Sequence, residues 1–247
     1  MQHFYKQIYT VWCAIVFIGL FLLLYPFFLI IIANKSWHKH CYYLNKLWAN
    51  VALFLVGIKT QIEGIDNLEI DKQYVYCANH FSLLDIVSFG FAPHSVVYVG
   101  KSDLAKIPLF GYMFRKLHVT VNRSSPTNSY KALQNALDKM GNDRSLAMFP
   151  EGGIMSKRIP EMSRFKDGAF RAAITKQIPL VPVSLPDNWI ILPDEKIPLI
   201  TRRKMRMIYH KPIATEGLNM EDIPSLKEKV YDIISSELNT LQEYEHK

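Results

Sequence analysis

The chain has 247 residues, enough for one substantial domain, and 49% of them are hydrophobic while 21% are charged. This composition excludes an intrinsically disordered polymer. The formal net charge of +7 and the isoelectric point near 9.2 favour an anionic partner, such as a nucleic acid, a membrane surface or a phosphate-bearing substrate. The positive charge is dispersed and no aromatic-basic binding module accompanies it, so we expect no nucleic-acid partner.

The three cysteines, Cys13, Cys41 and Cys77, have no spacing typical of metal ligands, and three thiols cannot all pair with one another. One lies in the apolar N-terminal segment and one in a predicted buried strand. We therefore expect small apolar side chains in a reducing compartment, and no metal site.

The N-terminal part contains an uncharged segment of 23 residues, 11–33. As a helix it would be roughly 34 Å long, which is enough for a hydrocarbon core of about 30 Å. The segment is too long for a cleaved signal peptide, and no small-x-small cleavage site precedes Asn34. We predict a membrane-embedded helix. Because Pro26 removes a backbone donor, a straight span and a broken or re-entrant insertion both remain open.

Residues 37–57 mix aromatic, apolar and basic side chains, a mixture typical of the headgroup interface. Lys35, Lys39 and Lys46 follow the apolar segment, whereas Lys6 is the only lysine before it. This asymmetry predicts a membrane protein whose remaining chain, including any active site, faces the cytoplasm.

Beyond Gly64, short apolar runs alternate with helical patterns. Strands are predicted at residues 74–78, 96–99, 119–121, 146–149, 180–185 and 205–209, and helices at residues 83–91, 129–140, 169–176 and 225–241. Strands that alternate with helices indicate an α/β fold, with a largely parallel or mixed β-sheet flanked by helices. We expect two regions: an N-terminal membrane anchor at residues 1–60, with a hydrophobic and an interfacial helix, and an α/β domain at residues 61–247.

His80 follows the first of these strands, in the run NHFSLLD at residues 79–85. His80 and Asp85 do not share a helix face, but they can meet if His80 lies in the turn and Asp85 in the first helical turn. Asp85 would then hold one imidazole nitrogen and leave the other free to take a proton as a general base. A capping box with Ser82 would also explain Asp85 without catalysis, but it would not explain a histidine at the end of a strand.

No convincing nucleophile accompanies this histidine. The chain has no G-x-S-x-G elbow, and Ser82 is better explained as a helix cap. A metal site at His80 and Asp85 lacks further spaced ligands. A His/Asp pair without a nucleophile suits direct attack by a substrate hydroxyl.

The run FPEGG at residues 149–153 again follows a predicted strand. Adjacent glycines let backbone amides approach an anion closely, although a plain glycine turn is the simpler explanation. The basic residues Lys157, Arg158, Arg164 and Lys166 follow this run.

Two further motifs lie at predicted strands, one just after a strand and one within a strand. Arg123 follows the strand at residues 119–121 and suits bidentate contact with a phosphate, although an isolated arginine there is usually just solvated. The run VPV at residues 181–183 is typical of a strand that Pro182 makes irregular.

Taken together and in this order, the motifs resemble the lysophosphatidic acid acyltransferase (1-acylglycerol-3-phosphate O-acyltransferase) family of the glycerophospholipid acyltransferase superfamily. The family's Asn-His-x4-Asp, later arginine, Phe-Pro-Glu-Gly and Val-Pro-Val are matched at residues 79–85, 123, 149–152 and 181–183. Lys101 with IPLFG at residues 107–111, and FKDGAF at residues 165–170, look like the family's connecting segments. The resemblance covers roughly residues 60–215.

The resemblance implies a mixed sheet flanked by helices, an N-terminal helical element in the membrane, and a hydrophobic tunnel for the acyl chain. It also implies that His80 deprotonates the free hydroxyl of a lysophospholipid while Asp85 orients the imidazole. That hydroxyl would attack the thioester of acyl-CoA or an acyl carrier protein, without an acyl-enzyme and without a further cofactor. The expected partners are therefore a lysophospholipid acceptor, an acyl thioester donor and membrane lipids.

The substrate-binding residues that the resemblance implies are Arg123, Glu151, Gly152, Gly153 and Lys101. The expected acceptor is 1-acylglycerol-3-phosphate, which would give phosphatidate. Members that act on lysophosphatidate commonly have Thr or Ser and then Arg after the Glu-Gly pair, whereas this chain has Gly153 and Ile154. This departure leaves another lysophospholipid or a lyso-aminolipid open as acceptor.

Three other functions also remain open from the sequence. A transacylase would take the acyl group from a phospholipid instead of a thioester, and a hydrolase would use water as acceptor. A non-catalytic membrane lipid-binding protein would use the same pocket without turnover.

Overall fold

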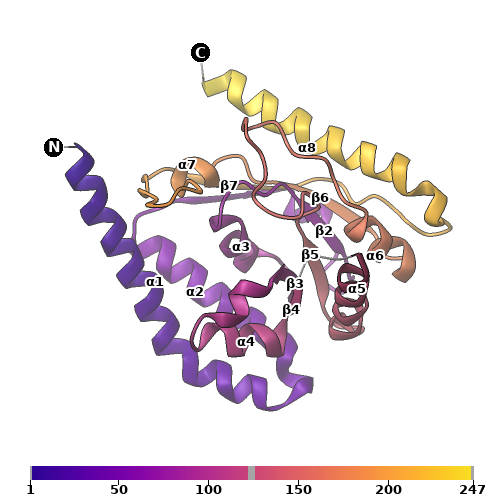
Figure 1. Cartoon of the computed structure of the whole chain (residues 1–247), viewed down its shortest axis with the longest axis horizontal. Coiled ribbons are helices and arrows are strands. Elements are labelled where there is room, and N and C mark those ends of the chain that lie inside the picture. Colours follow the sequence, from indigo (N-terminus) through magenta and orange to yellow (C-terminus); the bar gives the residue numbers. More distant parts are fainter. Residues whose placement is uncertain (1, 122–125, 246–247) are drawn as a thin grey trace.

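The computed structural model describes residues 2–121 and 126–245 of the chain (Figure 1). Over these residues it has one seven-stranded sheet with the order β1-β7-β6-β2-β5-β3-β4. The strands are β1 Thr60–Glu63, β2 Val75–Ala78, β3 Val96–Lys101, β4 Val119–Val121, β5 Ser145–Met148, β6 Leu180–Ser184 and β7 Met205–Tyr209. The α-helices are α1 Gln2–Ala33, α2 Cys41–Leu55, α3 Leu84–Ser88, α4 Phe110–Leu117, α5 Pro126–Met140, α6 Gly168–Lys176, α7 Asn188–Ile191 and α8 Ile223–Glu245.

The sheet is mixed. All neighbouring strands are parallel except β6 and β7, which are antiparallel, so β1 and β7 run against the other five. In the centre, Val75 of β2 lies opposite Leu146 of β5 and Leu180 of β6. The carboxyl ends of β2, β5 and β6 therefore meet at one edge of the sheet, where the loops of α/β proteins usually carry a site.

Alternation along the strands produces two buried faces. Val75 and Cys77 pack in the cluster that contains residues of α5, α6 and α8. Tyr76 and Ala78 face the opposite way, toward a cluster that contains Phe89, just after α3, and Phe114 of α4. Because both faces are covered, the central strands are almost continuously apolar, which is why they could be predicted from short apolar runs.

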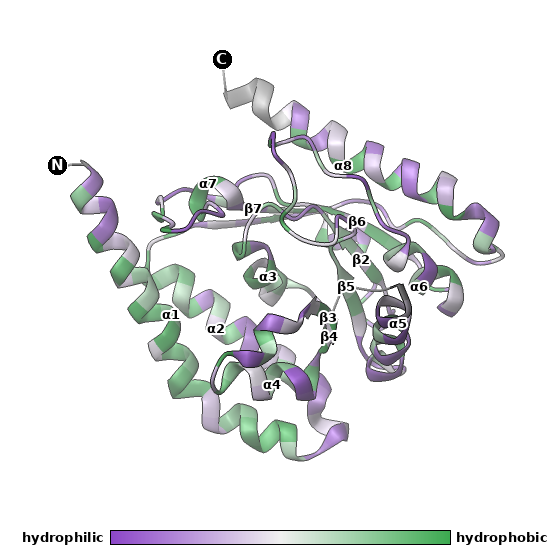
Figure 2. Ribbon diagram, in the orientation of Figure 1, coloured by the Kyte–Doolittle hydropathy of each residue, from purple (hydrophilic) through white to green (hydrophobic). Residues whose placement is uncertain are grey.

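The N-terminal helices α1 and α2 form an antiparallel pair on the α3 and α4 side of the sheet (Figure 1). Figure 2 shows that α1 is hydrophobic over most of its length. Within the described residues, His3–Ala33 is the one helix long and apolar enough to cross a membrane, and only 28% of its most apolar 18-residue stretch is buried. The predicted apolar helix is confirmed, and Pro26 lies inside it without ending it. Its insertion into a bilayer stays a prediction.

The helical pair is also tied to the sheet domain. The backbone N–H of Ile200, in the segment before β7, donates to the hydroxyl of Thr10 in α1 at 2.9 Å. Within the pair, the Tyr9 hydroxyl of α1 donates to the carbonyl of Val56, at the end of α2, at 2.7 Å. The predicted division at residue 60 falls on Thr60, the first residue of β1, and stays a prediction.

Six predicted strands and four predicted helices are present, with small shifts at their ends. The helix predicted at residues 83–91 is shorter, because α3 ends at Ser88 and a 3-10 turn continues to Phe91. Pro182 lies within β6, and its carbonyl accepts from the N–H of His210 at 3.0 Å, just beyond the paired residues of β7. Because proline has no N–H, this contact has a single hydrogen bond. The three cysteines are free and buried, as expected.

Candidate active site

His80 stands just after β2, in the turn that leads into α3. Its Nδ1 lies 2.9 Å from Oδ2 of Asp85, a carboxylate with no exposed surface. The backbone N–H groups of Phe81 and Ser82 donate to the same oxygen at 2.8 and 2.9 Å. Since Asp85 accepts from these N–H donors, Nδ1 is the imidazole nitrogen that carries the hydrogen. The other nitrogen, Nε2, is left as a proton acceptor.

The second oxygen of Asp85 is held from a distant part of the chain. Nδ2 of Asn188, at the start of α7, donates to Oδ1 of Asp85 at 2.9 Å and to the hydroxyl of Ser88 at 2.8 Å. Asn188 is fully buried, and its own Oδ1 has no hydrogen-bond partner within the described part of the chain. No motif in the sequence pointed to Asn188, because its role depends on a contact across the fold.

The capping and catalytic explanations of Asp85 are both compatible with this geometry. Oδ2 of Asp85 accepts from the N–H of Ser82, as in a capping box, and from the imidazole of His80. The Ser82 hydroxyl donates to the carbonyl of Leu192 at 2.6 Å and accepts from the N–H of Leu84 at 3.1 Å. A hydroxyl engaged in this way is poorly placed to act as a nucleophile.

Asn79 fixes the turn to the neighbouring strand. Its side-chain amide donates to the carbonyl of Leu185 at 3.0 Å, and its carbonyl oxygen accepts from the N–H of Leu185 at 2.8 Å. Because Leu185 follows β6, this pair of bonds joins the ends of β2 and β6 immediately before His80.

Phe149 and Glu151, which follow β5, support His80 from the other side. The Phe149 and His80 rings stack with centroids 4.1 Å apart and planes 18° apart. Oε1 of Glu151 accepts from the N–H of His80 at 2.7 Å, and Oε2 accepts from the N–H of Ser163 at 2.9 Å. Burial raises the pKa of Glu151 to about 7, against the opposing effect of these two N–H donors.

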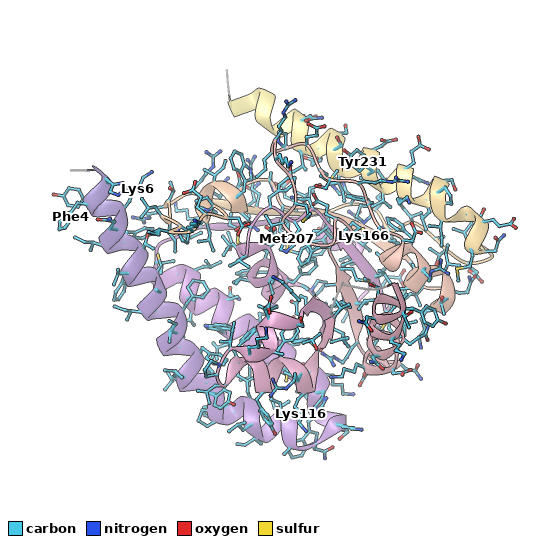
Figure 3. All side chains as sticks on the ribbon, viewed as in Figure 1. Phe4, Lys6, Lys116, Lys166, Met207 and Tyr231 are labelled. Carbon is cyan, nitrogen blue, oxygen red and sulfur yellow. The ribbon has the colours of Figure 1, made fainter. Side chains whose placement is uncertain are left out.

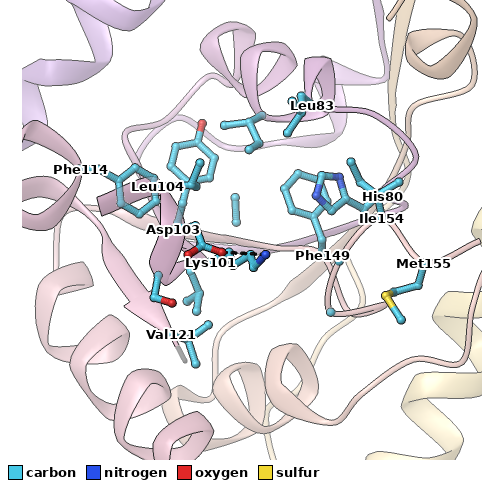
Figure 4. A pocket seen from close by; sticks show the side chains of 18 of the residues that line it. His80, Leu83, Lys101, Asp103, Leu104, Phe114, Val121, Phe149, Ile154 and Met155 are labelled. Carbon is cyan, nitrogen blue, oxygen red and sulfur yellow. Dashed lines mark ion pairs between the residues drawn. The ribbon is translucent and has the colours of Figure 1, made fainter. Parts of the chain in front are cut away.

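His80 lines a cavity of about 600 Å³ at this edge of the sheet (Figure 4). The walls are mainly apolar, and they include Leu83, Ile86, Tyr98, Phe114, Phe149, Ile154 and Met155. Figure 4 shows Lys101 on the opposite side from His80, with its ammonium paired to Asp103 at 2.7 Å. Lys101 and Lys106 together lower the pKa of Asp103 to about 2. A mainly apolar cavity with a few polar groups suits a small amphipathic ligand.

A second cavity of about 530 Å³ adjoins the first. Both are lined by Val99, Val121, Phe149 and Gly152, which form the boundary between them. The remaining lining of the second cavity comes from α5, the FPEGG turn and the start of α6, with Lys166, Asp167 and Arg171 as its charged residues.

Of the residues predicted to bind substrate, Lys101, Gly152 and Gly153 line the first cavity together with His80. The side chain of Glu151 is buried beneath the turn and bonded to two backbone amides. Arg123 lies outside the described residues. Across residues 2–121 and 126–245, no group of three or more His, Cys, Asp and Glu side chains could hold a metal ion. These arrangements suit proton abstraction from a bound hydroxyl by Nε2 of His80.

Comparisons with known proteins agree with this architecture. The family model described as Acyltransferase matches residues 59–186, more than half of the chain. The chain is 30% identical to "1-acyl-sn-glycerol-3-phosphate acyltransferase BAT2, chloroplastic" of Brassica napus, over 81% of this chain and 57% of that protein. It is 33% identical to a 1-acyl-sn-glycerol-3-phosphate acyltransferase of Saccharomyces cerevisiae, over 74% of this chain and 61% of that protein.

The chain thus spans between about half and three-fifths of the length of these curated relatives. Its fold is similar to the crystal structure of the 1-acyl-sn-glycerophosphate acyltransferase PlsC from Thermotoga maritima, with a TM-score of 0.78 and 21% identity. That similarity covers 96% of this chain and 98% of the other. With the family model matched across β1 to β6 and the sheet shared with a solved acyltransferase, this chain belongs to the Acyltransferase family.

Proposed function

We propose that this chain transfers a fatty acyl group from acyl-CoA or an acyl carrier protein to the free hydroxyl of 1-acylglycerol-3-phosphate, giving phosphatidate. One observation carries the proposal. The His80 imidazole is held at Nδ1 by the buried Asp85, while the ring lines a largely apolar cavity that also contains an ammonium group. The names of the curated relatives support this acceptor, as do the substrate-site residues that line the cavity with His80.

In the proposed reaction, Nε2 of His80 takes the proton from the acceptor hydroxyl, and the hydroxyl oxygen attacks the thioester carbonyl carbon. The imidazolium that forms is stabilised by the carboxylate of Asp85, which lies 2.9 Å from Nδ1. The tetrahedral intermediate then expels the thiolate, which takes the proton back from Nε2. One ester bond forms, one thioester bond breaks, and His80 ends in its starting state.

The acceptor acts as the only nucleophile in this scheme, so no acyl-enzyme is required. The engaged hydroxyl of Ser82 supports direct transfer, because it donates to Leu192. Phe149 holds the imidazole plane by stacking, and Glu151 holds the backbone N–H of His80, so the ring has little freedom to leave the proton-transfer geometry.

We place the reaction at a membrane surface, with the cavity on the cytoplasmic side. Supporting this, α1 leaves a row of large apolar side chains exposed, among them Phe4, Ile8, Val11, Ile15, Ile18 and Leu22. The lysines that follow α1 favour the cytoplasmic orientation. Lipid acceptors partition into a bilayer, so an enzyme attached there meets its substrate directly.

A different acceptor is the second candidate, because Ile154 lines the cavity and brings no charge to it. A lysophospholipid with another headgroup, or a lyso-aminolipid, would react by the same proton transfer at His80. A hydrolase or a transacylase would differ only in acceptor or donor, and a lipid-binding protein would show no turnover.

The test uses the purified full chain in detergent, with 1-acylglycerol-3-phosphate and labelled acyl-CoA, beside His80→Ala. We expect labelled phosphatidate from the wild type and at least about a hundredfold less from the variant. The same assay with acyl carrier protein, labelled phospholipid donors and lyso-aminolipids identifies the donor and the acceptor. Equal product from wild type and variant would overturn the His80 mechanism, and free fatty acid as sole product would indicate a hydrolase.

A further inference from the structure

We infer that Lys166 binds the phosphate group of the acceptor beside Gly152, and so determines the preference for a phosphate-bearing acceptor. This inference rests on the proposed function and specifies one residue of its substrate site. Lys166 lies in the segment between β5 and α6, near the middle of the molecule in Figure 3.

Lys166 is held against the FPEGG turn. Its backbone N–H donates to the carbonyl of Pro150 at 2.8 Å. Its ammonium lies directly beside Gly152, since a β-carbon built on Gly152 would stand only 2.4 Å from Nζ of Lys166. Gly152 also has a φ of +82°, a conformation that favours glycine. The turn therefore leaves space for the ammonium at the boundary between the two cavities.

The charge of Lys166 is not neutralised within the described part of the chain. No carboxylate there lies within salt-bridge distance of its ammonium, whereas Lys101 is paired with Asp103 and Lys227 with Asp167. The carboxylate of Glu151 is directed to two backbone N–H groups instead. Lys166 is thus a cation at the turn that is available to an anionic ligand.

The position suits the acceptor better than the donor. In 1-acylglycerol-3-phosphate the phosphate is attached to the carbon next to the one that bears the reacting hydroxyl, so it must bind a few ångströms from His80. Gly152 lines the same cavity as His80, and the preceding residue accepts the N–H of His80 at 2.7 Å. The phosphates of CoA lie at the far end of the pantetheine arm, well away from the thioester.

Other basic residues of this region are less well placed. Lys157, Arg158 and Arg164 are exposed and line neither of the two cavities. Arg171 lines the second cavity, but its guanidinium contacts the sulfur of Met220 at 3.6 Å. Lys166 is the cation that the geometry places against the turn.

The experiment compares Lys166→Met, Lys166→Arg and the control Lys157→Met with 1-acylglycerol-3-phosphate and with uncharged 1-acylglycerol as acceptors. For Lys166→Met we expect the KM for the phosphate acceptor to rise about tenfold. The rise is no larger because solvent screens the charge of an exposed side chain. The KM for acyl-CoA, the kcat and the activity on 1-acylglycerol should stay unchanged. Lys166→Arg and Lys157→Met should both behave like the wild type.

Two further variants test the geometry itself. Gly152→Ala should displace the ammonium and raise the same KM, whereas Gly217→Ala has a similar φ of +79° with no atom within 4 Å and controls for backbone strain. Ile154→Arg placed in the Lys166→Met protein should lower the KM again, because residue 154 lines the cavity and would restore a cation there.

Direct binding of 1-acylglycerol-3-phosphate in mixed micelles separates the inference from the proposed reaction. If the wild type binds the lipid without turning it over and Lys166→Met weakens binding, the reaction fails and the inference stands. If the wild type makes phosphatidate and Lys166→Met has an unchanged KM and an unchanged affinity for 1-acylglycerol-3-phosphate, the inference alone is overturned. A raised KM for acyl-CoA in place of the acceptor would overturn it as well.

Discussion

Two walls of the main cavity are built in different ways. On the His80 wall the polar groups are buried, and Asp85 is held by bonds from both neighbouring and distant residues. On the opposite wall the charge lies on long exposed side chains, with Lys101 71% exposed in its pair with Asp103. Buried hydrogen bonds fix an orientation closely, whereas an exposed lysine keeps its freedom. The proposed proton transfer thus depends on rigid geometry, and headgroup binding on adjustable charge.

The largest effect on the buried wall is expected from Asp85→Asn. The variant keeps the shape of the side chain but lacks the carboxylate charge that Nδ1 of His80 and the N–H groups of Phe81 and Ser82 donate to. We expect kcat to fall by about 10² to 10⁴ and the free energy of unfolding to fall by about 1–3 kcal/mol. Steady-state kinetics and thermal unfolding measure both.

Lys101→Met is the matched change on the exposed wall. It should raise the KM for the lysophospholipid acceptor and leave the melting temperature of the protein unchanged. A large loss of stability in Lys101→Met, or full turnover in Asp85→Asn, would contradict the difference between the walls.

The buried wall should also respond to pH through Glu151. Burial raises its pKa from 4.5 to about 7 in the folded protein, so the folded state holds the proton more tightly than the unfolded chain. Its stabilising effect is complete below pH 4.5 and is lost as the pH rises through 7. Relative to Glu151→Gln, the wild type should lose on the order of 3 kcal/mol across this range. Thermal unfolding of both proteins at a series of pH values measures this, and a difference that does not change with pH would contradict it.

The smallest expected effect concerns the distant support of Asp85. Asn188→Ala removes one donor to the carboxylate and one to the hydroxyl of Ser88, while the bond between His80 and Asp85 stays possible. We expect kcat to fall by about tenfold, with the KM of both substrates little changed, because one hydrogen bond to a charged group is worth about 1.5–3 kcal/mol. Asn188→Asp places a second carboxylate beside Asp85 and should be worse than alanine. An aspartate variant as active as the wild type would show that Asn188 does not position Asp85.

The parts of the site that could be predicted are those that lie close together in sequence. His80 and Asp85 are joined across one turn, so their spacing allowed the contact that the structure shows at 2.9 Å. Asn188 contacts Asp85 across 103 positions, and nothing in its neighbourhood marks it. Likewise the burial of the Glu151 carboxylate under the turn depends on Ser163, which no motif linked to it.

The same reasoning explains the elements that the sequence pattern missed. The strand β1, Thr60–Glu63, has two exposed and two half-buried residues, and its apolar pattern is too short to be recognised. It becomes a strand because β7 lies beside it. The helix α4, Phe110–Leu117, has eight residues and follows Pro108. Its apolar pattern is too short to distinguish a helix from a loop.

The pairing of β1 has a consequence for folding during synthesis on the ribosome. Thr60 lies opposite Met205, so β1 has no neighbouring strand until most of the chain has been made. At about 5–20 residues per second, roughly 7 to 30 s of translation separate the two strands. During this interval α1 and α2 are complete while the domain they pack against, which includes Met205, is not, and their apolar surface must be covered by something other than the finished fold.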